Sequence, residues 1–358
     1  MIYFDNATFC KPLPETIEFA QKQISEFYGD SFQIYSEGQK TKAVLEFYRS
    51  ELALLINSSS SSIFFTSGQT ESNNIIANSL QIGDYNSIIT SIYEHESVLK
   101  SLKFVGSKLN IPLLFVENEI DTGVSLIDLD KILYKNPHSF VSFSHVNRLT
   151  GRLLPVKRVV KTIRKYSSVF HCDMSDSLGK LPIDFKNLDI DVITGNSTNV
   201  GAISGSGFIC AKNDFHLQSV FFLGRNNELG IRPGIENVPA ISSMIFALKK
   251  SIEKIDENWE YLIKLKSNLK TELESNQVKY SSVSFSEKNF LPHFANLEMI
   301  NIKNFDIFLI KLDLKNVSVF DSRNELTNMF NNIRISLSPQ NTKEEIKLFC
   351  QILGSFVD

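Results

Sequence analysis

The stretch Asp191-Val-Ile-Thr-Gly-Asn-Ser-Thr-Asn-Val-Gly-Ala-Ile-Ser-Gly-Ser-Gly-Phe-Ile-Cys210 decides the fold of this chain of 358 residues. Its apolar opening predicts the end of a core strand, and a turn rich in Gly, Ser and Asn follows. A second apolar strand is expected from Gly207 onward. The segments upstream and downstream are best interpreted as the scaffold that presents this turn.

Upstream of this stretch, apolar strands alternate with helices. Strands are expected at 62–68, 87–92, 112–116, 140–144 and 169–173, with helices between them. Such alternation predicts right-handed βαβ units and an α/β fold with a mostly parallel central sheet covered by helices on both faces. Ligands of such sheets bind at the carboxyl ends of the strands. The side chains of His95, Asn147, Asp173 and Asn199 follow strands and are therefore expected to converge.

The remaining segments predict a second, smaller domain. Helical spacing is expected at 13–28 and 44–55, and one long helix at 239–273 links the two domains. Residues 280–358 mix strands with helices, which indicates a small α+β domain. We expect the large α/β domain to span 14–245 and the small domain to combine 1–13 with 246–358.

Composition excludes several classes of function. With 37 basic and 40 acidic residues the net charge is −3, so no basic stripe predicts nucleic-acid binding. No segment resembles a signal peptide or a membrane span, which predicts a soluble, cytoplasmic protein without a membrane partner. The four cysteines and six histidines are scattered, so neither a disulfide framework nor a metal site is expected.

A strand that ends in Ser67-Gly68 and leads into Gln69-Thr70 predicts an anion site. Backbone N–H groups at a helix N-terminus have no partner within the helix, and the helix dipole adds to their attraction for a phosphate. The hydroxyls of Ser67 and Thr70 are expected to contribute.

These motifs resemble the class V aminotransferase and cysteine desulfurase family, whose members have the fold-type I architecture and use pyridoxal phosphate (PLP). Gly205, Gly207, Phe208 and Ile209 keep the register of the family's motif. The resemblance implies that Gly68, Gln69 and Thr70 hold the phosphate of PLP and that His95 stacks on its ring. It further implies that Asp173 holds the pyridine nitrogen and that Arg334 clamps a substrate carboxylate.

The departures from the family fall on its chemistry. The register aligns Asn199 with the lysine that forms the Schiff base, and Thr198 with the preceding histidine. Asp176 replaces a glutamine on the phenolic oxygen of PLP, Arg148 an asparagine, and Ile235 a threonine of the partner subunit. The segment 320–332, where the family carries its catalytic cysteine loop, is short and contains no cysteine.

The resemblance and its departures together predict a cysteine desulfurase-like pseudoenzyme with a scaffolding or regulatory binding role. No catalytic residue is assigned, and PLP is expected to be absent or held non-covalently. Two alternatives remain open: an aminotransferase or desulfurase-type enzyme that uses non-covalent PLP or another base, and a phosphate or nucleotide sensor. The segment with Arg232 and Gly234 implies a homodimer, and an active paralogue or a sulfur-handling protein is a candidate partner.

Overall fold

The computed structural model describes residues 1–81, 83–119, 123–218, 223–282, 284–285, 289–323 and 331–356, and the chain divides into two compact units. Unit 1 comprises 1–10, 146–153 and 254–358, and unit 2 comprises 11–145 and 154–253. The expected boundaries, 14–245 for the large domain, lie near these. The inclusion of 146–153 in unit 1 was not anticipated.

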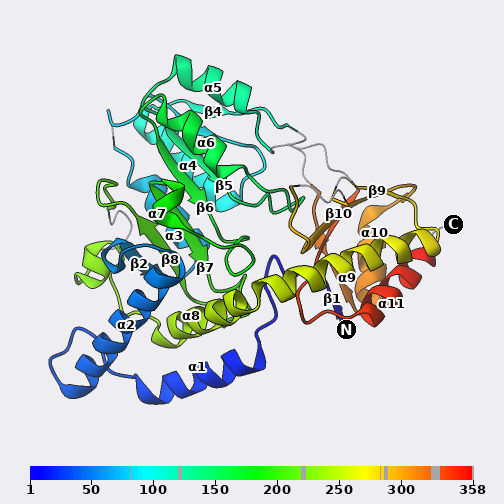
Figure 1. Cartoon of the computed structure of the whole chain (residues 1–358), viewed down its shortest axis with the longest axis horizontal. Coiled ribbons are helices and arrows are strands. Elements are labelled where there is room, and N and C mark those ends of the chain that lie inside the picture. Colours follow the sequence, from blue (N-terminus) through cyan, green and yellow to red (C-terminus); the bar gives the residue numbers. More distant parts are fainter. Residues whose placement is uncertain are drawn as a thin grey trace. The chain divides into compact units, whose positions relative to one another are not determined.

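Unit 2 is built on one sheet with the strand order β2-β8-β7-β6-β5-β3-β4 (Figure 1). Its strands are β2 (Ile63–Thr66), β3 (Ile88–Thr90), β4 (Leu113–Phe115), β5 (Phe140–Ser144), β6 (Val169–Asp173), β7 (Val192–Asn196) and β8 (Gly207–Ala211). β8 runs antiparallel to both of its neighbours, β2 and β7, and the other pairs of this sheet are parallel. The predicted α/β fold with a mostly parallel sheet is confirmed.

Helices cover both faces of this sheet. Its helices are α1 (Pro14–Glu26), α2 (Ser36–Leu55), α3 (Gln69–Asn78), α4 (Glu96–Leu109), α5 (Leu126–Lys135), α6 (Val156–Arg164), α7 (Phe185–Leu188) and α8 (Val238–Glu253), with 3₁₀ turns η1 (Ser60–Ser62) and η2 (Asn227–Gly230). One apolar cluster joins one sheet face to α2, α5, α6 and α8, and another joins the opposite face to α3 and α4. The carboxyl end of β2 therefore leads directly into a helix of the second face.

The glycines of the deciding stretch permit close contact between β8 and the start of α3. A Cβ on Gly207 would lie 2.7 Å from the Cα of Gly68 and 2.9 Å from the carbonyl oxygen of Gly195. Gly68 itself adopts φ 153° and ψ −178°, a region that is open essentially to glycine alone. The two glycines fix where α3 begins relative to the sheet edge.

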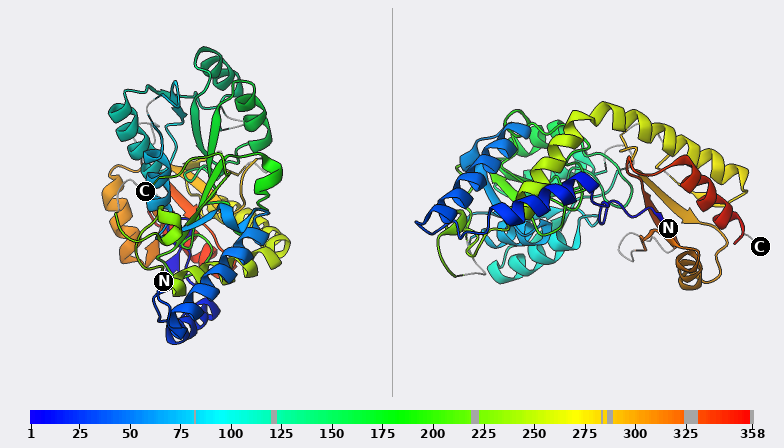
Figure 2. Two further views of the ribbon diagram at one scale, coloured as in Figure 1. Left: turned by 90° about the vertical axis from the view of Figure 1, so that its left-hand side faces the viewer. Right: turned by 90° about the horizontal axis from the view of Figure 1, so that it is seen from below.

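Unit 1 has a sheet with the order β12-β13-β10-β9, whose pairs are all antiparallel. Its elements are β1 (Ile2–Tyr3), α9 (Ile255–Ser275), β9 (Tyr280–Ser281), β10 (Phe294–Met299), α10 (Phe305–Leu314), β11 (Val317–Ser318), β12 (Phe320–Asp321), β13 (Asn332–Ser336) and α11 (Lys343–Gly354). Figure 2 shows α9 and α11, in yellow and red, side by side. The N-terminal β1 pairs in parallel with β11, and Phe4 packs edge-on against Phe349.

The single long helix expected at 239–273 is wrong in one respect. The helix is interrupted at Lys254, whose φ of −115° and ψ of 17° are not helical, and α8 and α9 lie on either side. The interruption coincides with the boundary between the units, because α8 buries its apolar face in unit 2 and α9 in unit 1. Among the residues described, no helix combines the length and apolar character needed to cross a bilayer.

Candidate functional site

A buried carboxylate, Asp173, lies at the centre of the candidate site in unit 2. It ends β6 at the carboxyl edge of the sheet and is 3% exposed. Its Oδ2 accepts hydrogen bonds from Nε2 of Gln69 (2.6 Å) and Nδ2 of Asn73 (3.0 Å), and its Oδ1 accepts one from the backbone N–H of Ser175 (3.0 Å). Burial opposes ionisation of Asp173, but these hydrogen bonds and the nearby His171 outweigh it and lower the pKa of Asp173. The site thus holds an anion that neutral donors stabilise.

His95 joins this network through α3 and α4. It is the N-cap of α4, where its Nδ1 accepts a hydrogen bond from the backbone N–H of Ser97 (3.1 Å). The neutral ring therefore carries its proton on Nε2. Asn73 links the two parts, since its Nδ2 also lies 2.9 Å from the hydroxyl of Ser97. His95 and Asp173 are brought together as expected, while the stacking role of His95 stays a prediction.

Asn199 lies in the loop after β7, and its side chain is bonded to Asp176. Its Nδ2 donates to Oδ1 of Asp176 at 2.7 Å. The hydroxyl of Thr198 lies 2.8 Å from Oδ1 of Asn196 and 3.1 Å from Oδ1 of Asn199, so its proton serves one of these acceptors. Nδ2 of Asn196 in turn lies 3.4 Å from Oε1 of Gln69. A chain of amide and hydroxyl groups therefore connects Asn199 with the surroundings of Asp173.

The predicted phosphate-binding turn leads into a helix as expected, but the carboxylate of Glu71 already accepts a hydrogen bond from it. Gly68 precedes Gln69 and Thr70 at the N-terminus of α3, whose first N–H groups have no acceptor in the helix. The backbone N–H of Ser67 donates to the carboxylate of Glu71. Glu71 also forms an ion pair with Arg232 at 3.4 Å. A phosphate at this turn would have to share its donors with Glu71.

Arg334 is described within unit 1 alone. It lies on β13 with 0% exposure, and its guanidinium donates to Asp5 (2.5 Å), Thr8 (2.8 Å) and the backbone carbonyl of Arg148 (3.0 Å). Its guanidinium carbon lies 4.0 Å above the ring of Phe320. These contacts satisfy much of its hydrogen-bonding capacity, and its role as a substrate clamp stays a prediction.

Two further positions singled out from the sequence are Asn147 and the segment 320–332, where the family carries its cysteine loop. Asn147 belongs to unit 1, where its Oδ1 accepts from the backbone N–H groups of Leu149 and Thr150, each at 3.0 Å. Its expected convergence with the residues of unit 2 is not tested. Most of the segment expected to replace the cysteine loop, at 324–330, lies outside the described residues.

Two titratable groups near the site, Glu94 and Cys172, matter for chemistry. Burial raises the pKa of Glu94 to about 7, although hydrogen bonds from Ser144 and Ser91 act in the opposite direction. Cys172 packs in the apolar cluster on the face opposite α3, so it points away from the face that Asp173 shares with Gln69. Burial, with Asp173 and Glu94 nearby, raises its pKa well above the usual value. Cys172 is therefore a poor nucleophile.

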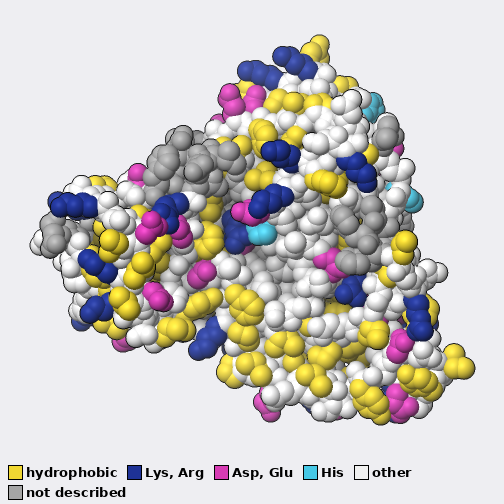
Figure 3. Space-filling view, turned by 180° about the vertical axis from the view of Figure 1, so that it is seen from behind, with side chains coloured by type: hydrophobic (Ala, Val, Ile, Leu, Met, Phe, Trp, Pro, Cys, Tyr) yellow, Lys and Arg dark blue, Asp and Glu magenta, His cyan; other side chains and the backbone are white. Residues whose placement is uncertain are grey.

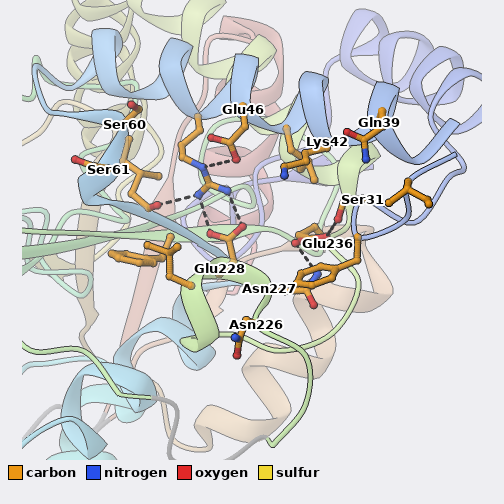
Figure 4. Close-up of a pocket in the computed structure, with 17 residues that line it drawn as sticks. Ser31, Gln39, Lys42, Glu46, Ser60, Ser61, Asn226, Asn227, Glu228 and Glu236 are labelled. Atoms are coloured by element: carbon orange, nitrogen blue, oxygen red, sulfur yellow. Dashed lines mark hydrogen bonds and ion pairs between the residues drawn. The ribbon is translucent and has the colours of Figure 1, made fainter. Parts of the chain in front are cut away.

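A cavity of about 630 Å³ in unit 2 lies between α2 and η2 (Figure 4). At its base Glu228 accepts from both terminal nitrogens of Arg49, at 2.7 and 2.8 Å, and from the backbone N–H of Phe65 at 2.8 Å. Glu228 and Leu229 both have positive φ, 48° and 56°. Glu236 accepts a hydrogen bond from Nδ2 of Asn227 in the same segment at 2.9 Å, and its other oxygen accepts one from the hydroxyl of Ser31 at 2.9 Å. These bonds fix a backbone conformation that is unfavourable for residues other than glycine.

The residues at the candidate site do not fit a covalently held PLP. Asn199 has no amine, and its carboxamide is bonded to a carboxylate. One carboxylate oxygen of Asp173, Oδ2, already accepts two amide donors. Sequence reasoning missed the side-chain contacts of Gln69 and Asn73. Their separation of one helical turn at the carboxyl edge of the sheet is the signal that places both on the face toward Asp173.

Comparisons with known proteins all find similarity to class V aminotransferases and cysteine desulfurases. The family described as aminotransferase class-V matches residues 2–349. A cysteine desulfurase IscS of Dictyoglomus turgidum is 27% identical over 321 residues, which cover 89% of this chain and 80% of that protein. The structure of a NifS-like protein from Rickettsia africae ESF-5 matches with a TM-score of 0.89 at 27% identity, over 99% of both chains. Another NifS-like protein, 24% identical over 99% of both chains with a TM-score of 0.90, supports the fold.

Proposed function

This chain belongs to the aminotransferase class-V family, and we propose that it is a cysteine desulfurase-like pseudoenzyme within that family. It has lost the chemistry that joins PLP to a lysine, and it acts by binding. The observation that carries the proposal is the bond of 2.7 Å between Asn199 and Asp176. An amide cannot form an imine, and the amide of Asn199 already donates a hydrogen bond to the carboxylate of Asp176.

The local chemistry supports the loss of desulfurase activity as well. The thiol nearest to Asp173 in sequence, Cys172, is buried on the opposite sheet face with a raised pKa. The segment 320–332 contains no cysteine that could replace it. Neither a thiolate nucleophile nor a Schiff-base amine is thus available at the positions that the family uses.

The test is the treatment of purified protein with PLP and then borohydride, followed by peptide mass spectrometry. We expect no phosphopyridoxyl group on any lysine of unit 2 and no alanine or sulfide from added cysteine. A stoichiometric label on one lysine would refute the proposal.

A second candidate function, a PLP enzyme with a displaced lysine, is favoured by one contact. Nζ of Lys180 lies 3.1 Å from the backbone carbonyl of Asp176, the residue whose carboxylate binds Asn199. The variant Lys180→Arg keeps the cation but cannot form an imine, so it is the control for the labelling experiment. A label that disappears in Lys180→Arg would establish this second function in place of the first.

We propose that binding begins with a homodimer. Large apolar side chains are exposed on α1, α2 and the loops beside them, and Figure 3 shows hydrophobic side chains gathered at this end of unit 2. They include Ile24, Tyr28, Ile34, Phe47, Leu54, Leu229 and Ile235. Monomers rarely expose such patches. Leu229 and Ile235 of this surface belong to the segment that the ion pairs of Glu228 and Arg232 hold in place. This supports a second copy of the chain as the first partner. An active paralogue or a sulfur-handling protein is proposed as a further one.

A further inference from the structure

We propose that Gln69 is a built-in occupant of the ring position of the ancestral cofactor site. Its carboxamide donates to Asp173 in place of a ring nitrogen and closes the site to planar pyridine ligands. The inference rests on the proposed function in that both concern the same site. It is a separate barrier, however, because it concerns the recognition of the ring and not the attachment of an aldehyde to a lysine.

The first argument is the geometry at Asp173. Nε2 of Gln69 approaches Oδ2 at 2.6 Å, the shortest of the three hydrogen bonds to this carboxylate, and Nδ2 of Asn73 approaches the same oxygen at 3.0 Å. An oxygen of a carboxylate accepts about two hydrogen bonds. A pyridine N–H could therefore reach Oδ2 only by displacing one of these amides.

The second argument concerns charge. Asp173 is fully buried, and burial holds the neighbouring His171 neutral by lowering its pKa to about 4. Hydrogen bonds, with that from Gln69 the largest contribution, therefore do most to stabilise the negative charge of Asp173. A buried carboxylate that loses a donor is costly. Gln69 meets this need without any ligand, so the site is electrostatically complete.

The third argument is the position of Gln69 in the chain. It is the first residue of α3, directly after Gly68, and the contact of Gly68 with Gly207 fixes the start of that helix. The Oε1 of Gln69 also lies 3.4 Å from Nδ2 of Asn196 at the end of β7. The side chain thus spans from α3 to β6 and β7, across the carboxyl edge of the sheet where a ligand of this fold binds.

The test uses pyridoxamine phosphate, which carries the ring and the phosphate but no aldehyde, so that its binding requires no lysine. Isothermal titration would compare the wild-type protein with Gln69→Ala and Gln69→Ser. The matched control is Gln39→Ala, which removes a glutamine whose Nε2 also makes one bond of 2.6 Å, to the carbonyl of Gln33 on the surface of unit 2. Circular dichroism verifies that each variant is folded.

We expect at least about a tenfold tighter affinity for pyridoxamine phosphate in Gln69→Ala or Gln69→Ser, which corresponds to about 1.4 kcal/mol. Gln39→Ala should bind as the wild type does, and inorganic phosphate should bind all four proteins equally. The inference is overturned if the wild type binds pyridoxamine phosphate as tightly as the Gln69 variants, or if neither folded variant gains affinity. A PLP–lysine adduct in the wild type would instead refute the proposed function.

Discussion

Replacement of Arg49 by Met should destabilise unit 2 far more than the loss of an ordinary ion pair. The carboxylate of Glu228 is 1% exposed, and Arg49 supplies two of its hydrogen bonds, at 2.7 and 2.8 Å. Breaking a buried pair by removing one partner costs about 3–5 kcal/mol, because the other charge stays buried. At roughly 2–4 °C per kcal/mol, the melting temperature should fall by about 10 °C.

The assay is thermal unfolding followed by far-ultraviolet circular dichroism, with two comparisons. Arg225→Met breaks an ion pair of 3.0 Å with Asp30 in which the arginine is 61% exposed, and it should cost less than about 1 kcal/mol. The double variant Arg49→Met/Glu228→Gln removes the uncompensated charge and should recover most of the loss. Equal losses for Arg49→Met and Arg225→Met, or a double variant less stable than Arg49→Met, would show that the reasoning about the buried charge is wrong.

Three further outcomes are expected. Burial raises the pKa of Glu94 from 4.5 to about 7, so its contribution to stability is full below pH 4.5 and is lost as the pH rises through 7. Glu94→Gln should therefore make the melting temperature less dependent on pH between pH 5 and 8, and an unchanged profile would contradict this. Gly207→Ala places a Cβ against the backbone of Gly68 and should cost about 1–3 kcal/mol in urea unfolding, whereas a neutral effect would show that β8 and the start of α3 are free to separate. Leu229→Asp with Ile235→Asp should convert a dimer to a monomer in sedimentation, with Leu314→Asp on α10 as the exposed control; dimers that persist would place the interface elsewhere.

Much of the sheet could be predicted from local sequence. The strand at 140–144 is buried along nearly its whole length, because a central parallel strand is covered on both faces. The break at Lys254 could not be predicted, since the helical pattern continues through it. What interrupts the helix is the change of core, from unit 2 to unit 1, and this depends on contacts distant in sequence.

The candidate site was predicted as a set of positions and not as a network. Asp173 and His95 could be located because Asp173 ends a strand and His95 follows one, and parallel strands end at one edge. The hydrogen bond from Gln69 to Asp173 depends on the conformation of a flexible side chain that has several acceptors within reach. Likewise, Glu71 returns to Ser67 and Asn199 turns to Asp176. Such choices are set by burial and by competing donors, which spacing alone does not reveal.

The pairing of β1 with β11 has a consequence for biosynthesis. Ile2 and Tyr3 are synthesised long before their partners Val317 and Ser318, and Asp5 is likewise synthesised long before Arg334. Unit 1 can therefore be completed only once the segment up to Phe349 has been made, and until then the apolar Phe4 has no Phe349 to cover it. Such an exposed segment in a nascent chain is a target for aggregation or for a chaperone. The residues of β1 are thus synthesised early and reach their native contacts late.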